Sequence, residues 1–361
     1  DGAVYSIDWY DRQHCHNPNT ERWERDNGRI YRLQYDPTYK PVTVNLGAMT
    51  DSELVGLHTH KNEWHVRTAR RLLNERSLER PIAPDATKTL RAMASDAATP
   101  ALRLRALWTL HAIDRFDEAL ASNLLADPND FVRSWVIQLL CENGSLTVPL
   151  ETKLIQLAAS DPSPTVRLYL ASAIQRLSSP TAWALIEALA LHSEDAGDRN
   201  LPLLLWQSLA ERMPGNVDRA FKLADTTKIP ALADYIGWYA ASLGNDDLEH
   251  AIDRLGQLRG EAQNRLLAGV ALAMDNTAGV PMPAAWKRIA PQLYASSMDR
   301  VRKDAQKIAA AFGDNSMFES LRTVLATRDA DPAQRRHAFS VLSRALDLDS
   351  LPVFLKLLDD P

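Results

Sequence analysis

The sequence predicts an all-α fold, an α-solenoid of about nine helix pairs preceded by a short β-hairpin. Two observations lead to this class. A helix-forming unit recurs along most of the chain at separations of 30 to 37 residues, and its apolar positions follow a 3.6-residue period. The 361 residues, 45% of them hydrophobic, are enough to bury the core that such a stack requires.

The best copy of the unit runs from Asp161 to Leu177. Asp161 and Pro162 end the preceding helix, and Ser163 can cap the next one. Pro164 then occupies the first helical position, where its missing N–H costs nothing. The apolar residues fall at offsets 0, 4, 7, 8 and 11, namely Val166, Leu170, Ala173, Ile174 and Leu177. Because one helix cannot bury this stripe alone, we expect it to pack against copies of itself.

An arginine recurs near the start of the inner helix of each unit. Clear copies place it at Arg67, Arg103, Arg133, Arg167, Arg302 and Arg335, and weaker copies place Leu201, Tyr235 and Arg265 at the same point. A planar guanidinium at this point can pair with the carboxylate of an Asp-Pro turn and with free carbonyl groups at a helix end. We therefore predict a ladder of arginines between repeats and prefer it to a substrate site.

The N-terminal region predicts two antiparallel strands. Side chains alternate over residues 3–10 and 29–35, and a long polar loop connects the two stretches. Two strands alone are marginal in water, so we expect their partners to lie upstream of the given sequence. The predicted domains are C-terminal strands of a truncated sheet at 1–36, a linker at 37–50, and helical repeats at 51–361 with the last one truncated. The chain is accordingly expected to be an internal fragment of a larger protein.

Charge and hydropathy exclude some classes of partner. A net charge of −5 and a pI near 6.0 offer no general attraction to phosphate, so no nucleic-acid partner is expected. The most apolar windows, 182–191 and 266–274, are too short for a bilayer, so no transmembrane segment is predicted. Cys15 and Cys141 form no recognisable framework and do not report the redox compartment.

Motifs that carry catalytic or cofactor chemistry are missing from the sequence. It contains no Gly-x-Ser-x-Gly, no Gly-x-x-x-x-Gly-Lys, no His-Glu-x-x-His and no Cys-x-x-Cys-His. The expected role of the repeats is therefore binding or spacing rather than catalysis. The same preference applies to Trp108, Trp135, Trp183, Trp206 and Trp238, which lie in apolar helix contexts. Core packing is favoured over ligand stacking for these side chains.

The best metal candidates are His14, Cys15 and His16 in the polar loop. In an extended backbone His14 and His16 would point the same way, although two ligands are too few and a loop that packs without metal is the preferred alternative. A turn between helices supplies a second, weaker set, His58, His60 and His65. The acidic loop with Glu194, Asp195 and Asp198 lacks the oxygen-ligand spacing of a calcium loop and is predicted to be solvated.

Several stretches resemble one multidomain family, the membrane-bound dehydrogenases or PVC-type haem-binding proteins. Residues 1–11 and 24–33 are similar to the last strands of the family's β-propeller. Residues 62–76 and 198–206, together with Ala311-Phe-Gly-Asp314, resemble the HEAT-type repeats that follow the propeller. The resemblance covers nearly the whole chain. It implies a propeller similar to glucose/sorbosone dehydrogenases, then HEAT repeats, then a cytochrome c domain with Cys-x-x-Cys-His.

Two functional hypotheses follow. By resemblance, the chain is the HEAT-repeat scaffold of an oxidoreductase acting on sugars or alcohols, itself non-catalytic, with the propeller and cytochrome c domains of the same chain as partners. This implies haem c in the parent and none in this chain, in a periplasmic or secreted setting. Alternatively, the repeats form an interaction module without a redox role, which binds a protein or a glycan on its concave face.

Overall fold

The computed structural model describes residues 3–8, 19–20, 28–40, 42–142, 144–275 and 277–358. The metal candidates His14, Cys15 and His16 lie outside these residues. The chain divides into two compact units, 1–90 and 91–361, and the division falls within helix α3 (Pro84–Asp96). We call them unit 1 and unit 2.

Unit 1 begins with the β-hairpin that the alternating side chains predict. Strands β1 (Val4–Ile7) and β2 (Ile30–Leu33) are antiparallel, with Val4 opposite Leu33 and Ile7 opposite Ile30. All eight strand residues are exposed, and apolar side chains occur on both faces of the pair. The hairpin therefore lacks a core of its own within the described residues.

The helical part of unit 1 is organised around the start of α1. Its elements are η1 (Leu46–Ala48), α1 (Asp51–Gly56), η2 (Leu57–Thr59), α2 (Glu63–Glu79) and the first half of α3. A capping box starts α1, because the Thr50 hydroxyl accepts the Glu53 N–H and the Glu53 carboxylate accepts the Thr50 N–H. The buried Asp51 accepts hydrogen bonds from Arg76 and Arg80 of α2, at 2.9 and 2.8 Å. The Arg80 guanidinium holds the pKa of Asp51 well below its usual range.

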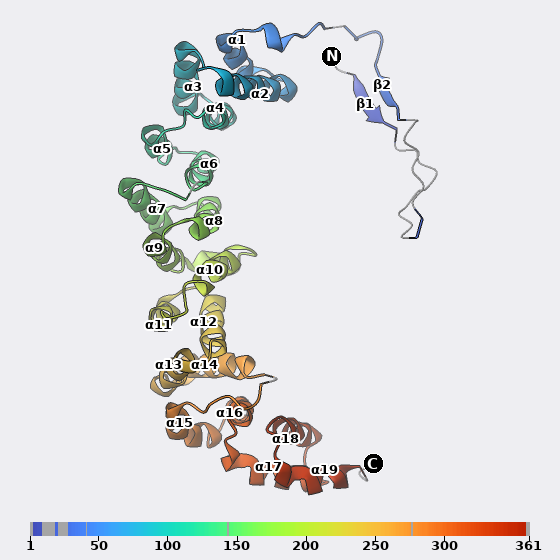
Figure 1. Ribbon diagram of the computed structural model, residues 1–361, viewed down its shortest axis with the longest axis vertical. Helices are drawn as coiled ribbons and strands as arrows, with labels where there is room; N and C mark the ends of the chain where they lie inside the picture. Colours follow the sequence, from blue (N-terminus) through green and yellow to red (C-terminus); the bar gives the residue numbers. More distant parts are fainter. Residues whose placement is uncertain are drawn as a thin grey trace. The chain divides into compact units, whose positions relative to one another are not determined.

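Unit 2 is a stack of helices in two layers (Figure 1). The outer layer consists of the second half of α3, α5 (Glu118–Leu124), α7 (Val148–Ser160), α9 (Ser179–Leu189), α11 (Val217–Thr226), α13 (Asn245–Gln257), α15 (Ala284–Tyr294) and α17 (Phe318–Ala326). The inner layer consists of α4 (Pro100–Ala112), α6 (Asp130–Leu140), α8 (Pro164–Ala173), α10 (Leu201–Ala210), α12 (Pro230–Ser242), α14 (Gly260–Ala273), α16 (Asp299–Phe312) and α18 (Pro332–Arg344). Each inner helix contacts the next inner helix along the chain.

Short 3-10 helices and one last α-helix complete unit 2. They are η3 (Ile174–Arg176), η4 (Ser193–Asp195), η5 (Asn315–Met317), η6 (Leu348–Ser350) and α19 (Leu351–Leu357). In Figure 1 the helices α16 and α18 turn toward the inner side, which makes the surface of the inner layer concave. We call this surface the inner face.

The predicted fold class is confirmed. In chain order the described helices form nine successive pairs, from α1 and α2 to α17 and α18, and α19 follows them. In the best copy, α8 begins at Pro164 as predicted, and the five stripe residues from Val166 to Leu177 are all buried. None of the described helices combines the length and the hydropathy that crossing a bilayer requires.

One detail of the best copy differs from the prediction. Ser163 is the N-cap residue of α8, but its hydroxyl makes no capping hydrogen bond. It donates instead to the carboxylate of Asp130, the first residue of α6, at 2.8 Å. The free end of one inner helix is thereby tied to the preceding inner helix, which is a contact between repeats rather than a local cap.

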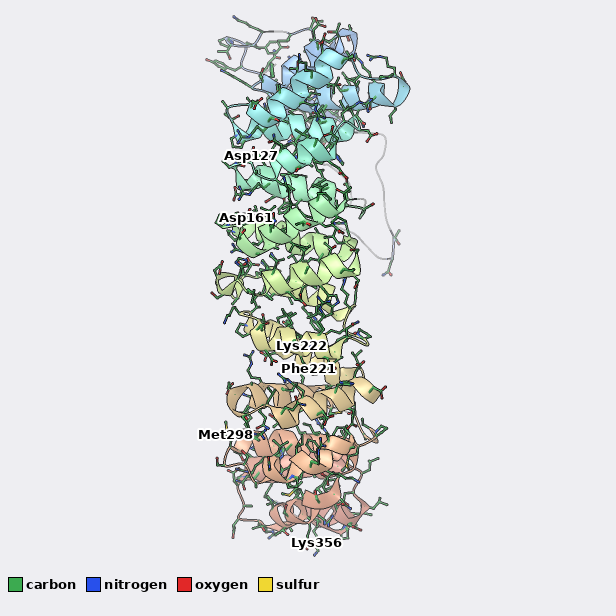
Figure 2. The ribbon with its side chains drawn as sticks, turned by 90° about the vertical axis from the view of Figure 1, so that its left-hand side faces the viewer. Asp127, Asp161, Phe221, Lys222, Met298 and Lys356 are labelled. Carbon is green, nitrogen blue, oxygen red and sulfur yellow. The ribbon has the colours of Figure 1, made fainter. Side chains whose placement is uncertain are left out.

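The predicted arginine ladder is present in the first half of unit 2. Arg133 donates to both carboxylate oxygens of Asp161 at 2.8 Å, and Arg167 donates in the same way to Asp195 at 2.5 and 2.7 Å. Each guanidinium also donates to a carbonyl six residues back, so Arg133 bonds Asp127 O and Arg167 bonds Asp161 O. Arg103 binds the Asp127 carboxylate to begin the series. Figure 2 shows Asp127 and Asp161 one above the other along the same edge of the stack.

Measured from the first residue of each inner helix, the ladder position is the fourth. It holds Arg103, Arg133, Arg167, Leu204, Ala233, Gln263, Arg302 and Arg335 in helices α4 to α18. The predicted assignments of Leu201, Tyr235 and Arg265 are therefore wrong, since these residues are first or sixth in their helices. Arg67 is also out of register, because it is the fifth residue of α2 and is exposed.

The hydrogen bond from the fourth side chain to a carbonyl group also occurs in repeats that follow the ion-paired part of the ladder. Gln263 donates to Leu255 O at 3.1 Å, Arg302 donates to Ser296 O at 2.7 Å, and Arg335 donates to Leu325 O at 3.2 Å. These carbonyls belong to the last turns of outer helices or to the residues that follow them, where intrahelical donors run out. In most repeats the fourth side chain thus donates to a carbonyl group at the end of the outer helix, and this contact fixes the rotation of the inner helix in those repeats.

Candidate ligand-binding grooves on the inner face

The sixth residue of four consecutive inner helices is aromatic. These residues are Trp135 in α6, Tyr169 in α8, Trp206 in α10 and Tyr235 in α12. In an α-helix the sixth position lies about 200° around the axis from the fourth. In α6 and α8 the fourth residues, Arg133 and Arg167, point into the repeat junction, so the sixth residue points away from it, onto the inner face. We call these four residues the aromatic stripe.

The stripe consists of two pairs of rings, and each side chain is half-buried. The ring centroids of Trp135 and Tyr169 lie 6.4 Å apart, and those of Trp206 and Tyr235 lie 5.3 Å apart. Both separations are within the range in which aromatic rings attract each other. Contacts within each pair restrict the orientation of the rings, and part of each ring surface remains exposed to solvent.

Additional rings widen both ends of the stripe. Trp108 of α4 lies edge-on to Trp135 at 5.0 Å, and Trp238 of α12 lies 6.3 Å from Trp206. The prediction that the tryptophans are core residues is correct for Trp183, which is 3% exposed. Trp108, Trp135, Trp206 and Trp238 are only half-buried, and the last three also line grooves, so the preference for packing over ligand stacking stays a prediction for them. An apolar helix context does not separate these two cases.

The first groove, groove A, crosses α6, α8 and α10 and has a volume of about 490 Å³. Its lining comprises Trp135, Gln138, Leu168, Tyr169, Ser172, Asn200, Leu203, Leu204 and Gln207. No charged side chain is part of this lining, as far as the described residues extend. Groove A therefore combines aromatic and aliphatic surface with neutral amide groups that can both donate and accept hydrogen bonds.

The second groove, groove B, crosses α10, α12, α14 and α16 and has a volume of about 870 Å³. Its aromatic lining is Trp206, Tyr235 and Trp238. Below it α12 and α14 approach closely, since a Cβ atom at Gly269 would lie 2.9 Å from the backbone nitrogen of Trp238. Because glycine has no Cβ atom, α12 and α14 can pack in direct contact at the bottom of groove B.

Groove B is charged but nearly balanced. Four carboxylates and three cations line it: Asp234, Glu261, Asp275 and Asp304, with Arg265, Arg300 and Lys307. Arg265 donates to Asp234 at 2.8 Å, and Arg344 of α18 pairs with Asp275. This balance does not favour a polyanion.

Asp304 is a largely buried carboxylate of this lining with only long ion pairs. Its side chain is 14% exposed, and its cationic neighbours Arg300 and Lys307 stand 3.8 and 3.9 Å away, too far for hydrogen bonds. Burial raises the pKa of the Asp304 carboxyl, which the two cations lower in part. The group can therefore take a hydrogen-bond donor from a ligand.

The weaker histidine set has structural contacts. His58 is fully buried, and its Nδ1 lies 3.3 Å from Leu54 O. His60 accepts the Asn62 N–H at 2.9 Å, and its ring lies 4.2 Å from that of His65. Burial lowers the pKa of His65, and His60 lowers it further. These contacts shape the turn before α2, and no three His, Cys, Asp or Glu side chains of the described residues are grouped to hold a metal ion.

The acidic loop is not simply solvated, which corrects the prediction. Asp195 is 3% exposed because it is the ladder partner of Arg167. Asp198 accepts the backbone N–H groups of Asn200 and Leu201 at the start of α10. The pairing of Asp195 could have been predicted from the sequence, because Arg133 and Arg167 both lie 28 residues before their carboxylate partners.

The described linings of the two grooves offer amide, hydroxyl and carboxylate groups for hydrogen bonding. As far as the structure describes them, their linings contain neither histidine nor cysteine. Cys141 is buried, and burial raises the pKa of its thiol to about 12, so it is a poor nucleophile. Comparisons with protein-family models and with curated proteins give no match for this chain, so no relative assigns a role to either groove.

Proposed function

We propose that unit 2 is an interaction module that holds an extended polypeptide along its inner face, across the helices. The observation that carries the proposal is the aromatic stripe, four half-buried rings at one position of four successive repeats. Rings of this kind provide a large contact area at a low cost in conformational entropy. A ligand that crosses successive repeats must itself be extended.

The lining of groove A favours a polypeptide over a glycan. Leu203 is 45% exposed beside the rings, and Leu168 and Leu204 add aliphatic surface. Aliphatic side chains suit apolar side chains of a peptide, and the nearby amides of Gln138 and Gln207 suit its backbone. A carbohydrate would leave the leucine surface without an apolar partner.

The test uses the stripe and a matched control. A library of unstructured 15-residue peptides is screened by display, and each binder is measured by quenching of tryptophan fluorescence. We expect Trp206→Ala and Tyr169→Ala to weaken binding at least tenfold. Phe131→Ala serves as the control, because Phe131 is 55% exposed on α6 and belongs to neither groove. Binding that is insensitive to every stripe substitution, or no peptide binding at all, would refute the proposal.

A second proposal rests on the family resemblance and on the hairpin. Apolar side chains on both faces of β1 and β2 are exposed, including Val4 at 66% and Ile30 at 75%. Strands of this composition are typical of a larger sheet covered on both sides. This supports a larger sheet in the same chain, such as the propeller of the resembled family, while the cytochrome c domain rests on the resemblance alone.

That second proposal has a separate test. A longer chain from the same gene, expressed with haem-maturation machinery, is expected to show a Soret band and to reduce a dye in the presence of a sugar or alcohol. A longer chain without a Cys-x-x-Cys-His motif would refute it. Neither outcome decides whether the inner face binds peptides.

A further inference from the structure

The linings of the two grooves differ in charge. None of the nine residues in the described lining of groove A is charged, whereas seven of the fourteen residues that line groove B are. The two grooves meet at α10, because Leu203 and Gln207 line groove A and Trp206 lines groove B. A ligand that extends along the inner face therefore meets an uncharged surface over α6 and α8 and a charged one toward α16.

Four neutral polar side chains of groove A are open to a ligand. They form no hydrogen bond with other residues in the described parts of the chain: Gln138, Ser172, Asn200 and Gln207. A glutamine of a later inner helix is used differently, since Gln263 donates to Leu255 O at 3.1 Å. Each free amide in groove A offers both a donor and an acceptor without a net charge.

A charged side chain of a ligand would lose free energy on groove A. Covering the groove removes water from the ligand, and the described lining holds no opposite charge to replace that water. An extended main chain fits better, because its N–H and C=O groups need hydrogen-bond partners when water is removed. The amides of Gln138 and Gln207 present the complementary donor and acceptor groups.

We propose that groove A binds an uncharged segment of the extended polypeptide and contacts the main chain of that segment through the amides of Gln138 and Gln207. The rings of Trp135 and Tyr169 and the adjoining leucine surface receive its apolar side chains. Charged residues of the ligand lie outside this segment. The inference rests on the proposed peptide-binding function and adds the class of peptide sequence that the groove accepts.

The probe is the tightest uncharged 15-residue peptide from the display library, labelled with fluorescein at one end. Each position is replaced in turn by lysine, by glutamate and by the N-methyl form of the same residue, and binding is measured by fluorescence anisotropy. We expect one contiguous block of positions at which lysine and glutamate each weaken binding at least tenfold, because either charge lacks a partner. N-methylation should weaken binding at some positions of the same block, because it removes a main-chain donor.

A charge-swap variant assigns this block to groove A. Gln138→Glu keeps the shape of the side chain and places a carboxylate in the groove. It should strengthen binding of at least one lysine-substituted peptide of the block tenfold or more, and of no glutamate-substituted peptide. Gln156→Glu is the matched control, because Gln156 is exposed on the outer helix α7 and belongs to neither groove. It should leave every affinity unchanged, and circular dichroism verifies that the helices of both variants are intact.

The outcomes separate this inference from the proposed function. Stripe-dependent peptide binding that tolerates lysine and glutamate at every position, or that no uncharged peptide shows, overturns the inference and leaves the peptide-binding function standing. So does tolerance of N-methylation at every position, or a charge-sensitive block that Gln138→Glu does not alter. Stripe-dependent binding of a soluble oligosaccharide such as cellohexaose, without binding of any peptide, overturns both proposals.

Discussion

Removing one guanidinium from the ladder should destabilise unit 2 strongly at one place. Arg167 and Asp195 are 3% and 4% exposed in their side chains, and Arg167 makes two hydrogen bonds to Asp195 and one, at 2.9 Å, to Asp161 O. In Arg167→Met the carboxylate stays buried without its partner. Breaking a buried pair in this way costs about 3–5 kcal/mol.

The assay must be local, because long repeat arrays do not unfold in one step. Native-state hydrogen exchange reports the opening free energy of the amides in α8 and in the helices on either side. We expect these amides to lose about 3–5 kcal/mol of protection in Arg167→Met. Arg288→Met is the control, since Arg288 pairs with Asp253 at 2.7 Å but is 72% exposed. It should cost less than about 1 kcal/mol.

A double variant separates lost pairing from lost packing. In Arg167→Met with Asp195→Leu no charge remains buried, and most of the protection should return, because apolar pairs commonly replace buried ion pairs without loss. Equal protection in Arg167→Met and in the Arg288→Met control would refute the interpretation of the ladder as a buried, stabilising element.

Three further predictions concern packing and pH. Leu170 is fully buried, so Leu170→Ala should cost the amides of α8 about 2–5 kcal/mol of hydrogen-exchange protection, and unchanged protection would show that the stripe is not a core face. Gly269→Ala places a Cβ atom 2.9 Å from Trp238 N, so it should lower the free energy of unfolding by about 1–3 kcal/mol. It should also weaken peptide binding at groove B. Equal peptide affinity in the variant would show that the crossing of α12 and α14 does not shape the groove. Burial lowers the pKa of His337 to about 4 in the folded protein, below the value of about 6.5 in the unfolded chain. The unfolded chain therefore binds the proton more readily than the folded one. The free energy of unfolding near α18 should be at its maximum above about pH 6.5 and fall as the pH drops toward 4. The charged groups around His337 are Lys303, Lys307 and Arg344, which lower its pKa, and Asp299, which raises it. An NMR titration of His337 with a midpoint near 6.5 would contradict the last prediction, and His337→Gln should remove the pH dependence.

The class of fold and part of the ladder could be predicted because both depend on local patterns. The stripe of α8 follows from spacing alone, and Arg133 and Arg167 share the same proline-containing turn before their helices. The register failed where that turn is absent. In α10 and α14 the helix start could not be located from sequence, so Leu201 and Arg265 were aligned with the fourth position although they are first and sixth.

The aromatic stripe could not be predicted for a different reason. Trp183 and Trp206 have equally apolar neighbours in sequence, yet the first is buried in an outer helix and the second lines groove B. The two cases differ in the layer to which the helix belongs and in the rotation of the helix, and both depend on contacts between repeats. An alignment on helix starts would have shown the recurring sixth position.

The buried state of Asp195 and the bond from Ser163 to Asp130 were missed on similar grounds. Both contacts join residues about 30 positions apart, and local signals such as polarity or capping preference describe only the residue and its near neighbours. In a repeat protein the hydrogen-bond partner of a polar side chain often lies in the neighbouring repeat rather than in the same turn.

The break in the arginine ladder has a consequence for the salt dependence of unit 2. From Arg103 to Asp195 buried charged hydrogen bonds cross-link the repeats, whereas Leu204 of α10 and Ala233 of α12 can only make dispersion contacts at the same position. Ion pairs that join repeats in this region, such as Arg219 with Glu187 and Arg265 with Asp234, are more exposed than those of the ladder. Because salt screens exposed charges more than buried ones, high ionic strength should weaken these contacts before those of the ladder.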